Sequence, residues 1–229
     1  YIGRLVEKDY KKAYKWFEKA AQAGYVVAQN NLGVMYANGY GVERDYEKAY
    51  QWFKKGVEVG YAKAQMNLGL LYQKGYGVKS DYEKAVELYS KAAESGYVKG
   101  QTNLAIMYQQ GLGVDKNLDK AIKWYKKAAK AGENKAQNEI GQMYFEGRGL
   151  EKNYKKAFKW YMRAAKDGFA KAQANLGLMY DKGQGVERDY EKAFKWIKKA
   201  AKAGNNNAQY NLGLMYYKGQ EVAKDYNRA

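Results

Sequence analysis

The stretch that decides the fold is AQANLGLMYDKGQGVERDYEKAFKWIKKAAKAG at residues 172–204, because its pattern recurs along the chain. Equivalent positions are 36 residues apart in every case, with no insertion. The first residue of the L-G pair, for example, falls at Leu32, Leu68, Leu104, Ile140, Leu176 and Leu212. A tyrosine follows it after four residues and a glycine after seven. Self-similarity at a fixed period of this length is typical of repeat proteins, so we predict one structural repeat used many times.

The first half of each repeat has the pattern of an amphipathic helix, which we call helix A. Over residues 26–37, Ala28, Leu32 and Met35 fall on one helical face at i, i+4 and i+7. Gly39 and Gly41 follow. Glycine ends helices because it adopts left-handed backbone geometry at little cost. We therefore predict that helix A stops at these glycines.

The second half of each repeat predicts another helix, helix B, which begins after an Asp or Asn. These side chains accept hydrogen bonds from the backbone amides of the first turn. The predicted N-caps are Asp9, Asp45, Asp81, Asn117, Asn153, Asp189 and Asp225. The predicted inner stripe of the second helix B is Ala49, Trp52, Phe53 and Gly56. A glycine such as Gly60 then closes the repeat, as is common just past a helix C-terminus.

A single pair of these helices is too small to bury its apolar stripe. Stacking each pair on the next buries it, and the product is a solenoid held together by contacts between neighbours. We therefore predict an all-α fold, with residues 1–229 forming a single array of about six repeats. The complete repeats fall near 25–60, 61–96, 97–132, 133–168 and 169–204, with partial repeats at both ends. We interpret the chain as part of a longer array, so no cellular location is predicted.

The composition argues against an enzyme. The 229 residues include no Cys and no His, which excludes disulfides, Cys-ligated metals and catalysis by thiolate or imidazole. The small hydroxyl side chains are Ser80, Ser90, Ser95 and Thr102 alone, so a hydroxyl nucleophile is also poorly supplied. No apolar run approaches the ~20 residues that a membrane helix needs. We expect no catalytic residues, no metal ligands and no cofactor.

The repeat resembles the Sel1-like repeat, a relative of the tetratricopeptide repeat. The shared pattern is A-Q-x-x-L-G-x-x-Y-x-x-G-x-G-V-x-x-D-Y-x-K-A-x-x-W-Y/F-x-K-A-A-x-x-G, with local departures such as Leu88, Ala105 and Glu221. The resemblance implies a right-handed α/α superhelix with helix A on the concave side and helix B on the convex side. It also implies an adaptor or scaffold for protein complexes, often in bacteria. Cysteine-rich relatives that act on β-lactams lend no activity here, because their cysteines are missing.

Two columns of helix A vary between repeats and mark a candidate partner surface. They lie seven residues apart, which is two helical turns, so both fall on one face. With the neighbouring Asn column they give the candidate partner-binding residues Asn30, Met66, Asn67, Gln73, Thr102, Asn103, Gln109, Asn138, Phe145, Asn175, Asp181, Tyr210 and Tyr217. Amides can engage a peptide main chain and aromatic rings can anchor its side chains. The alternative is that these are solvent positions under no packing constraint.

A third variable column lies in the loop after helix A. It includes Tyr40, Tyr76, Leu112 and Arg148. Exposed aromatic rings at these loop tips would form a ridge that a partner could contact. The alternative is that they cover the next repeat.

The charge points to a second candidate surface. The chain carries 41 Lys+Arg against 24 Asp+Glu, a net charge of +17. Many cations lie on one face of the later helices B, at Lys123, Lys127, Lys159, Arg163, Lys195 and Lys199. A basic face can bind phosphates through counterion release, so electrostatic binding of nucleic acid or an anionic surface is the alternative function. We expect no stacking aromatics among these cations, which favours a merely solvated helix face.

Overall fold

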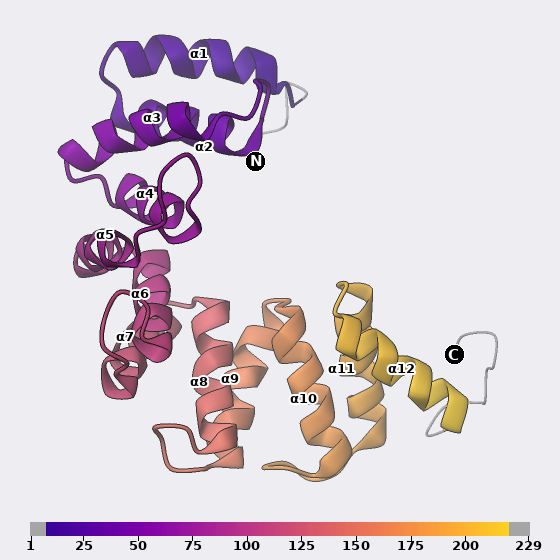
Figure 1. Cartoon of the computed structure of the whole chain (residues 1–229). Coiled ribbons are helices and arrows are strands. Elements are labelled where there is room, and N and C mark those ends of the chain that lie inside the picture. Colours follow the sequence, from indigo (N-terminus) through magenta and orange to yellow (C-terminus); the bar gives the residue numbers. More distant parts are fainter. Residues whose placement is uncertain (1–7, 220–229) are drawn as a thin grey trace. The chain divides into compact units, whose positions relative to one another are not determined.

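The computed structural model describes residues 8–219, and within them it is built from helices with no strand (Figure 1). Each helix has 13 residues, as expected for two helices in a 36-residue repeat. Their bounds are α1 (Tyr10–Gln22), α2 (Val26–Asn38), α3 (Tyr46–Glu58), α4 (Ala62–Lys74), α5 (Tyr82–Glu94), α6 (Val98–Gln110), α7 (Leu118–Lys130), α8 (Asn134–Glu146), α9 (Tyr154–Lys166), α10 (Ala170–Lys182), α11 (Tyr190–Lys202) and α12 (Asn206–Lys218). Odd numbers are helices B and even numbers are helices A. The predicted all-α class is confirmed.

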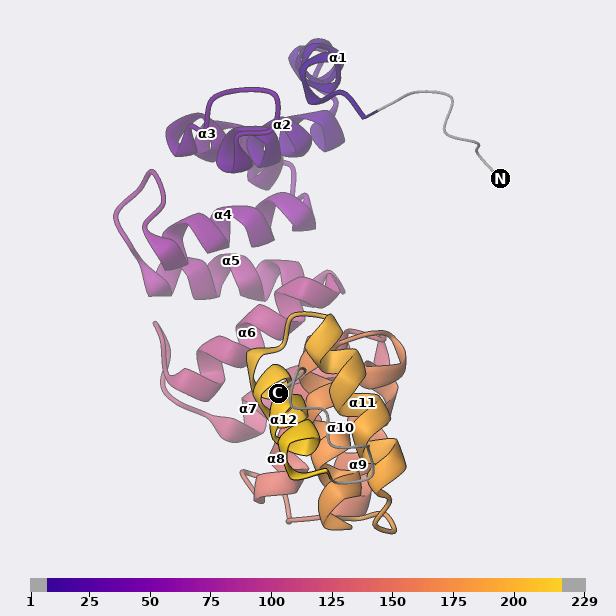
Figure 2. The same cartoon turned by 90° about the vertical axis from the view of Figure 1, so that its right-hand side faces the viewer.

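The helices fall into two compact units, with the boundary between Asn117 and Leu118. We call them the N-terminal unit, with α1–α6, and the C-terminal unit, with α7–α12. In both units each helix packs against the one before and the one after it, as α4 and α5 do in Figure 2. The chain is therefore a solenoid of helix pairs. The prediction of a single array over residues 1–229 stays a prediction. Within residues 8–219, every helix is too short or too polar to span a bilayer.

The helix ends follow the predicted capping residues. Helix α2 ends at Gly39, which has a left-handed backbone with φ 71° and donates its N–H to the carbonyl of Met35. Asp45 caps α3, since its carboxylate accepts the backbone N–H of Lys48 at 2.9 Å, and this bond lowers the pKa of Asp45. The same N-cap bond occurs at Asp9, Asp81, Asn153 and Asp189. The predicted cap Asp225 lies outside the described residues.

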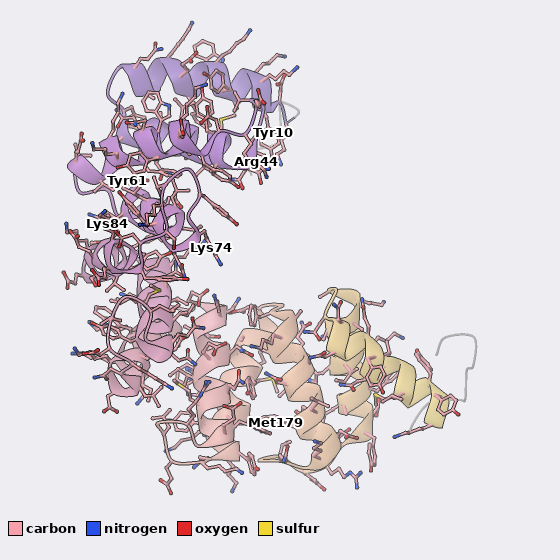
Figure 3. All side chains as sticks on the ribbon, viewed as in Figure 1. Tyr10, Arg44, Tyr61, Lys74, Lys84 and Met179 are labelled. Carbon is pink, nitrogen blue, oxygen red and sulfur yellow. The ribbon has the colours of Figure 1, made fainter. Side chains whose placement is uncertain are left out.

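The loop after each helix A lies against the start of the preceding helix B. At Gly41, where φ is 71°, an added Cβ would come within 2.8 Å of the backbone nitrogen of Lys11. Beside it, the ring of Tyr40 stacks on Tyr10 with ring centroids 4.8 Å apart, and Tyr76 stacks on Tyr46 at 4.7 Å. Tyr10 lies at the start of α1, beside the loop that carries Arg44 (Figure 3). These rings therefore stack on the preceding repeat rather than the next one, while Tyr40 and Tyr76 stay 40% and 42% exposed.

The core is made where a helix-A glycine meets a large helix-B side chain. A Cβ added at Gly141 would lie 2.8 Å from the ring of Tyr161, and one added at Gly177 would lie 2.7 Å from Ile197. Both partner side chains are buried, as is Met179, labelled in Figure 3. Glycine is thus required by the close approach of the two helices at these two positions, although the third repeat has the buried Ala105 in the same column. The same column of helix B is filled by Phe53, Tyr89 and Tyr125 in earlier repeats.

The tryptophans lie at the edge of this core, which corrects their predicted place in the inner stripe. Trp16 is 69% exposed, while Trp52, Trp124, Trp160 and Trp196 are half-buried. For Trp52, Trp160 and Trp196 the reason is geometric, because the residue that follows each of them points at a helix-A glycine. The tryptophan itself is rotated about 100° away along the helix, towards solvent.

We predict that Gly177→Ala destabilises the protein by about 1–3 kcal/mol, because the new methyl group overlaps Ile197. Ile197→Ala alone should cost about 2–5 kcal/mol through the cavity it leaves. The double variant should cost clearly less than the sum of the two, since each change relieves the other. Free energies of unfolding from urea titrations of all four proteins measure this coupling. Additive costs would show that the two residues are not in contact.

We also predict an alkaline loss of stability caused in part by Tyr161. Burial raises the pKa of Tyr161 well above the ordinary tyrosine value of about 10. Below about pH 10 the hydroxyl of Tyr161 is protonated in both the folded and the unfolded protein. Above that pH it loses its proton first in the unfolded protein, so the free energy of unfolding falls as the pH rises. Tyr161→Phe should make the decline between about pH 10 and 12 shallower, by at most about 1.4 kcal/mol per pH unit. Tyr25→Phe, at an exposed position, should leave the decline unchanged.

Candidate functional site

The helix-A side of the C-terminal unit contains two hollows between successive helices A. The first, about 240 Å³, lies between α8 and α10 and is lined by Gln142, Phe145, Lys171, Asn175, Leu178 and Lys182, among others. The second, about 120 Å³, lies between α10 and α12 and is lined by Asp181, Asn211, Leu214 and Lys218, among others. Leu178 lines both, so the hollows share a wall. We call them together the helix-A groove. It brings together Phe145, Asn175 and Asp181 from the predicted set.

The helix-A groove mixes apolar and polar groups. Phe145 is half-buried, and its ring centroid lies 5.1 Å from that of Tyr154. The ammonium group of Lys171 lies 3.6 Å from a carboxylate oxygen of Glu139. The side chains of Asn211 and Lys182 have no hydrogen bond or ion pair within residues 8–219. The groove thus offers an aromatic ring, an unpaired amide and an unpaired cation.

The first variable column is buried rather than exposed, which corrects part of the predicted partner surface. Asn30 is 4% exposed, Thr102 is 3% exposed and Asn138 is fully buried. Met66 is half-buried, and Tyr210 alone is strongly exposed. Because these members are buried, a partner cannot reach them in this packing.

Asparagines of this surface hold neighbouring repeats together. The amide nitrogen of Asn67 donates to the side-chain oxygen of Asn30 at 2.9 Å, and Asn175 donates to Asn138 in the same way at 3.2 Å. Both bonds join residues 37 positions apart, one repeat to the next. The equivalent Asn103 has no such bond within the described part of the chain, because Met66 occupies the acceptor position. Amides predicted to meet a partner therefore serve the fold in two places.

The second variable column is half-buried over most of its length. Gln73 accepts a hydrogen bond from the hydroxyl of Tyr89 at 2.8 Å, and Gln109 is half-buried as well. Phe145 and Asp181 line the helix-A groove. Tyr217 is exposed near the end of α12. This column is the accessible part of the predicted surface.

Sequence reasoning missed a structural role for the repeated A-Q dipeptide. The amide nitrogens of Gln101, Gln137 and Gln173 donate to carbonyls at the end of the preceding helix B, at 3.1–3.3 Å. These carbonyls lie in the last turn and also accept the backbone N–H of Gly96, Gly132 and Gly168, so each glutamine adds a second donor. The signal was the recurrence of Gln at one position in every repeat, because a solvent-exposed position has no need of the same residue each time. The groove residues Gln142, Lys171 and Leu178 gave no such signal, because nothing in their columns distinguishes them.

The predicted basic face differs from expectation in one respect, because its cations do lie against aromatic rings. Lys127, Arg163 and Lys199 lie over the rings of Trp124, Trp160 and Trp196, at 4.4, 4.7 and 4.6 Å from the ring centroids. Lys195 pairs with Glu191. Lys123 and Lys159 are exposed. The cation–π contacts occupy one face of each indole, so these rings are partly covered.

Within residues 8–219, no three Asp or Glu side chains lie close enough together to hold a metal ion.

We predict that Asn67→Ala destabilises the protein by about 1–2 kcal/mol, because the buried oxygen of Asn30 loses its donor. Asn103→Ala is the matched control at the same place in the next repeat, and it should change stability by about 0.5 kcal/mol or less. Urea denaturation of the two variants gives the comparison. Equal costs would mean that the bond between repeats contributes nothing.

Known proteins share both the sequence pattern and the fold. The Sel1 repeat family model matches residues 1–25, 26–61, 62–97, 98–133, 134–169, 170–205 and 206–229. Each full match begins one residue after the repeat boundary inferred from the sequence. No curated protein sequence matches the chain.

Solved structures give the same answer. A protective antigen of uropathogenic Escherichia coli with an SLR fold is 38% identical, with a TM-score of 0.82 over 97% of this chain. The chain spans 48% of that protein, about half its length. A Sel1 repeat protein from Oxalobacter formigenes is 34% identical, with a TM-score of 0.83 over 94% of this chain and 93% of its own. An immunity protein from Pseudomonas aeruginosa, Pa5087, is 21% identical over 88% of this chain and 77% of its own, with a TM-score of 0.62, and shares the fold. The chain belongs to the Sel1 repeat family.

Proposed function

We propose that this chain is a non-catalytic scaffold that binds an extended segment of a partner protein in the helix-A groove. Sel1 repeat proteins are generally scaffolds for protein interactions. The observation that carries the proposal is the pair of adjoining hollows between α8, α10 and α12, which share Leu178 as a wall. A groove of this kind suits a chain rather than a compact ligand, because it continues from one repeat to the next.

The chemistry of the groove supports a peptide as the occupant. An extended peptide presents unpaired main-chain N–H and C=O groups, which the free amide of Asn211 can meet. Its apolar side chains can pack on Phe145 and Leu178. Lys182 and Asp181 offer charges of both signs, which would set direction and register and contribute a smaller part of the affinity than the apolar anchor.

Catalysis has little support in the chain. The sequence contains no imidazole and no thiol, so the usual general bases and nucleophiles are missing. Two carboxylates at or beside the groove, Glu139 and Glu146, lie against Lys171 and Arg148 at 3.6 and 3.5 Å, while Asp181 is a third carboxylate in its lining. Groups paired in this way serve as charged contacts, which fits a binding surface.

A random dodecapeptide library displayed on phage tests the proposal. We expect enriched peptides that bind the purified chain, and we expect Phe145→Ala to weaken them about tenfold or more, as loss of an aromatic anchor does. Fluorescence anisotropy with the labelled peptides measures the affinities. Affinity should change little at higher salt, because the anchor is apolar.

Lys182→Ala and Lys74→Ala make a matched pair, since the two lysines hold the same place in their repeats but only Lys182 lines the groove. Binding should weaken in the first variant and not in the second. Peptides that bind both Phe145→Ala and Lys182→Ala as tightly as the original chain would refute the helix-A groove as the site.

A further inference from the structure

A third hollow lies on the helix-B side of the C-terminal unit. Its volume is about 660 Å³, within the range of pockets that hold small ligands or a few residues of a peptide. Its lining contains the six lysines Lys166, Lys192, Lys195, Lys198, Lys199 and Lys202 and no carboxylate. Met162, Tyr180 and Trp196 supply the rest of the lining, which is apolar and comes from α9, α10 and α11. We call it the lysine hollow.

Part of the positive charge in the lysine hollow has no counterpart. Lys192 and Lys195 pair with Asp189 and Glu191, at 2.7 and 2.5 Å. Lys166 and Lys202 have no ion pair, hydrogen bond or ring contact within residues 8–219. Two uncompensated ammonium groups on one concave surface attract an anionic partner.

The fold does not require lysine at these positions. Lys166 and Lys202 belong to the last position of helix B, which is Glu58 in α3 and Glu94 in α5. The column of Lys195 holds Gln51 and Glu87 in those same helices. The N-terminal unit therefore folds with glutamate in both columns, at Glu58, Glu94 and Glu87, although Lys15 of α1 stands in the column of Lys195. Helix B therefore forms without lysine at these positions, and we attribute the lysines of the C-terminal unit to the function of its surface.

We propose that the lysine hollow binds an acidic peptide segment of a partner protein, with one large apolar side chain of that segment on Met162, Tyr180 and Trp196. Carboxylates on either side of that side chain would meet Lys166 and Lys202. The occupant needs both parts, because the lining contains both lysines and large apolar side chains. This site is separate from the helix-A groove, so the proposal for either site can be correct without the other.

Nucleic acid fits the hollow less well than a peptide does. Binding of single strands relies on bases stacked on open aromatic faces. The ammonium group of Lys199 already lies over the ring of Trp196, and that of Lys192 lies over Tyr180 at 5.6 Å. The cations are all lysines, whereas bidentate phosphate recognition favours arginine.

A membrane surface also fits less well. Peripheral binding buries exposed apolar side chains in the lipid interface. None of the large apolar residues of the lysine hollow is among the exposed ones. A concave site gives its apolar groups to a protruding side chain rather than to a flat surface.

The probe is a fluorescein-labelled peptide in which Asp and Glu flank a single Phe, with a second peptide in which Ser replaces the Phe. We expect saturable binding of the Phe peptide by anisotropy and at least about fivefold weaker binding of the Ser peptide, from the lost apolar burial. Lys166→Glu with Lys202→Glu should weaken the Phe peptide about tenfold or more. Helix content by circular dichroism should not change, since Glu already occupies this column in α3 and α5.

Lys123→Glu with Lys130→Glu is the matched control. It reverses two charges on α7, outside the hollow, with the same change in net charge. Lys130 shares the column of Lys166 and Lys202, and Lys123 shares the column of Lys195. It should weaken binding of the Phe peptide by less than about threefold, because only long-range attraction is lost. Phe145→Ala in the helix-A groove should leave this affinity unchanged, which keeps the two sites distinguishable.

Four results would overturn the proposal. The first is equal weakening in the two lysine double variants, which would mean attraction without a site. The second is equal affinity for the Phe and Ser peptides. The third is tighter binding of oligothymidylate, or of vesicles containing phosphatidylserine, than of the Phe peptide. The last is the absence of saturable binding up to about millimolar peptide, the weakest range of specific association.

Discussion

The contact between a helix-A glycine and the large side chain of the following helix B is the constraint on which the rest of the structure depends. Because Gly141 and Gly177 have no side chain, the helix A that carries each of them can approach the next helix B closely enough to bury Tyr161 and Ile197, respectively. That approach fixes the rotation of helix B, because one column must point at the glycine. The tryptophan before it is then turned to the edge, and the lysine columns are turned to solvent.

Hydrogen bonds add directional constraints to this apolar packing. The glutamine of the A-Q dipeptide ties each helix A to the end of the helix B before it, as Gln137 does at the carbonyl of Ala129. Its side-chain oxygen stays buried without a partner within the described residues. An unmet buried acceptor costs free energy, so the array keeps this amide at a cost in every repeat where it is buried. We infer that the bond selects the stacking of one repeat on the next, because a solely apolar interface would tolerate sliding.

Most of the fold could be predicted from the sequence, because the period and the caps are local signals. Gly39 and Asp45 define where a helix ends and the next begins without reference to any distant contact. The partner surface could be predicted only in part. Variation at Asn30 and Asn138 was compatible with exposure, yet both are buried. The interface between repeats accepts Asn, Met, Thr or Ala in that column, although the facing residue of the next repeat is Asn in all but one case. A buried packing position can therefore vary as much as an exposed one.

The hollows could not be predicted at all, since they arise between helices rather than within one. Phe145 and Leu178 are 33 positions apart in the chain and share a hollow only because α8 and α10 stack. Once the core columns are fixed, however, the remaining surface is free to change its charge without changing the fold. Residues 118–219 carry 22 Lys+Arg against 10 Asp+Glu, while residues 8–117 carry 16 against 11. Because both units share one fold, we infer that this difference in charge reflects what the two surfaces bind rather than what the fold requires.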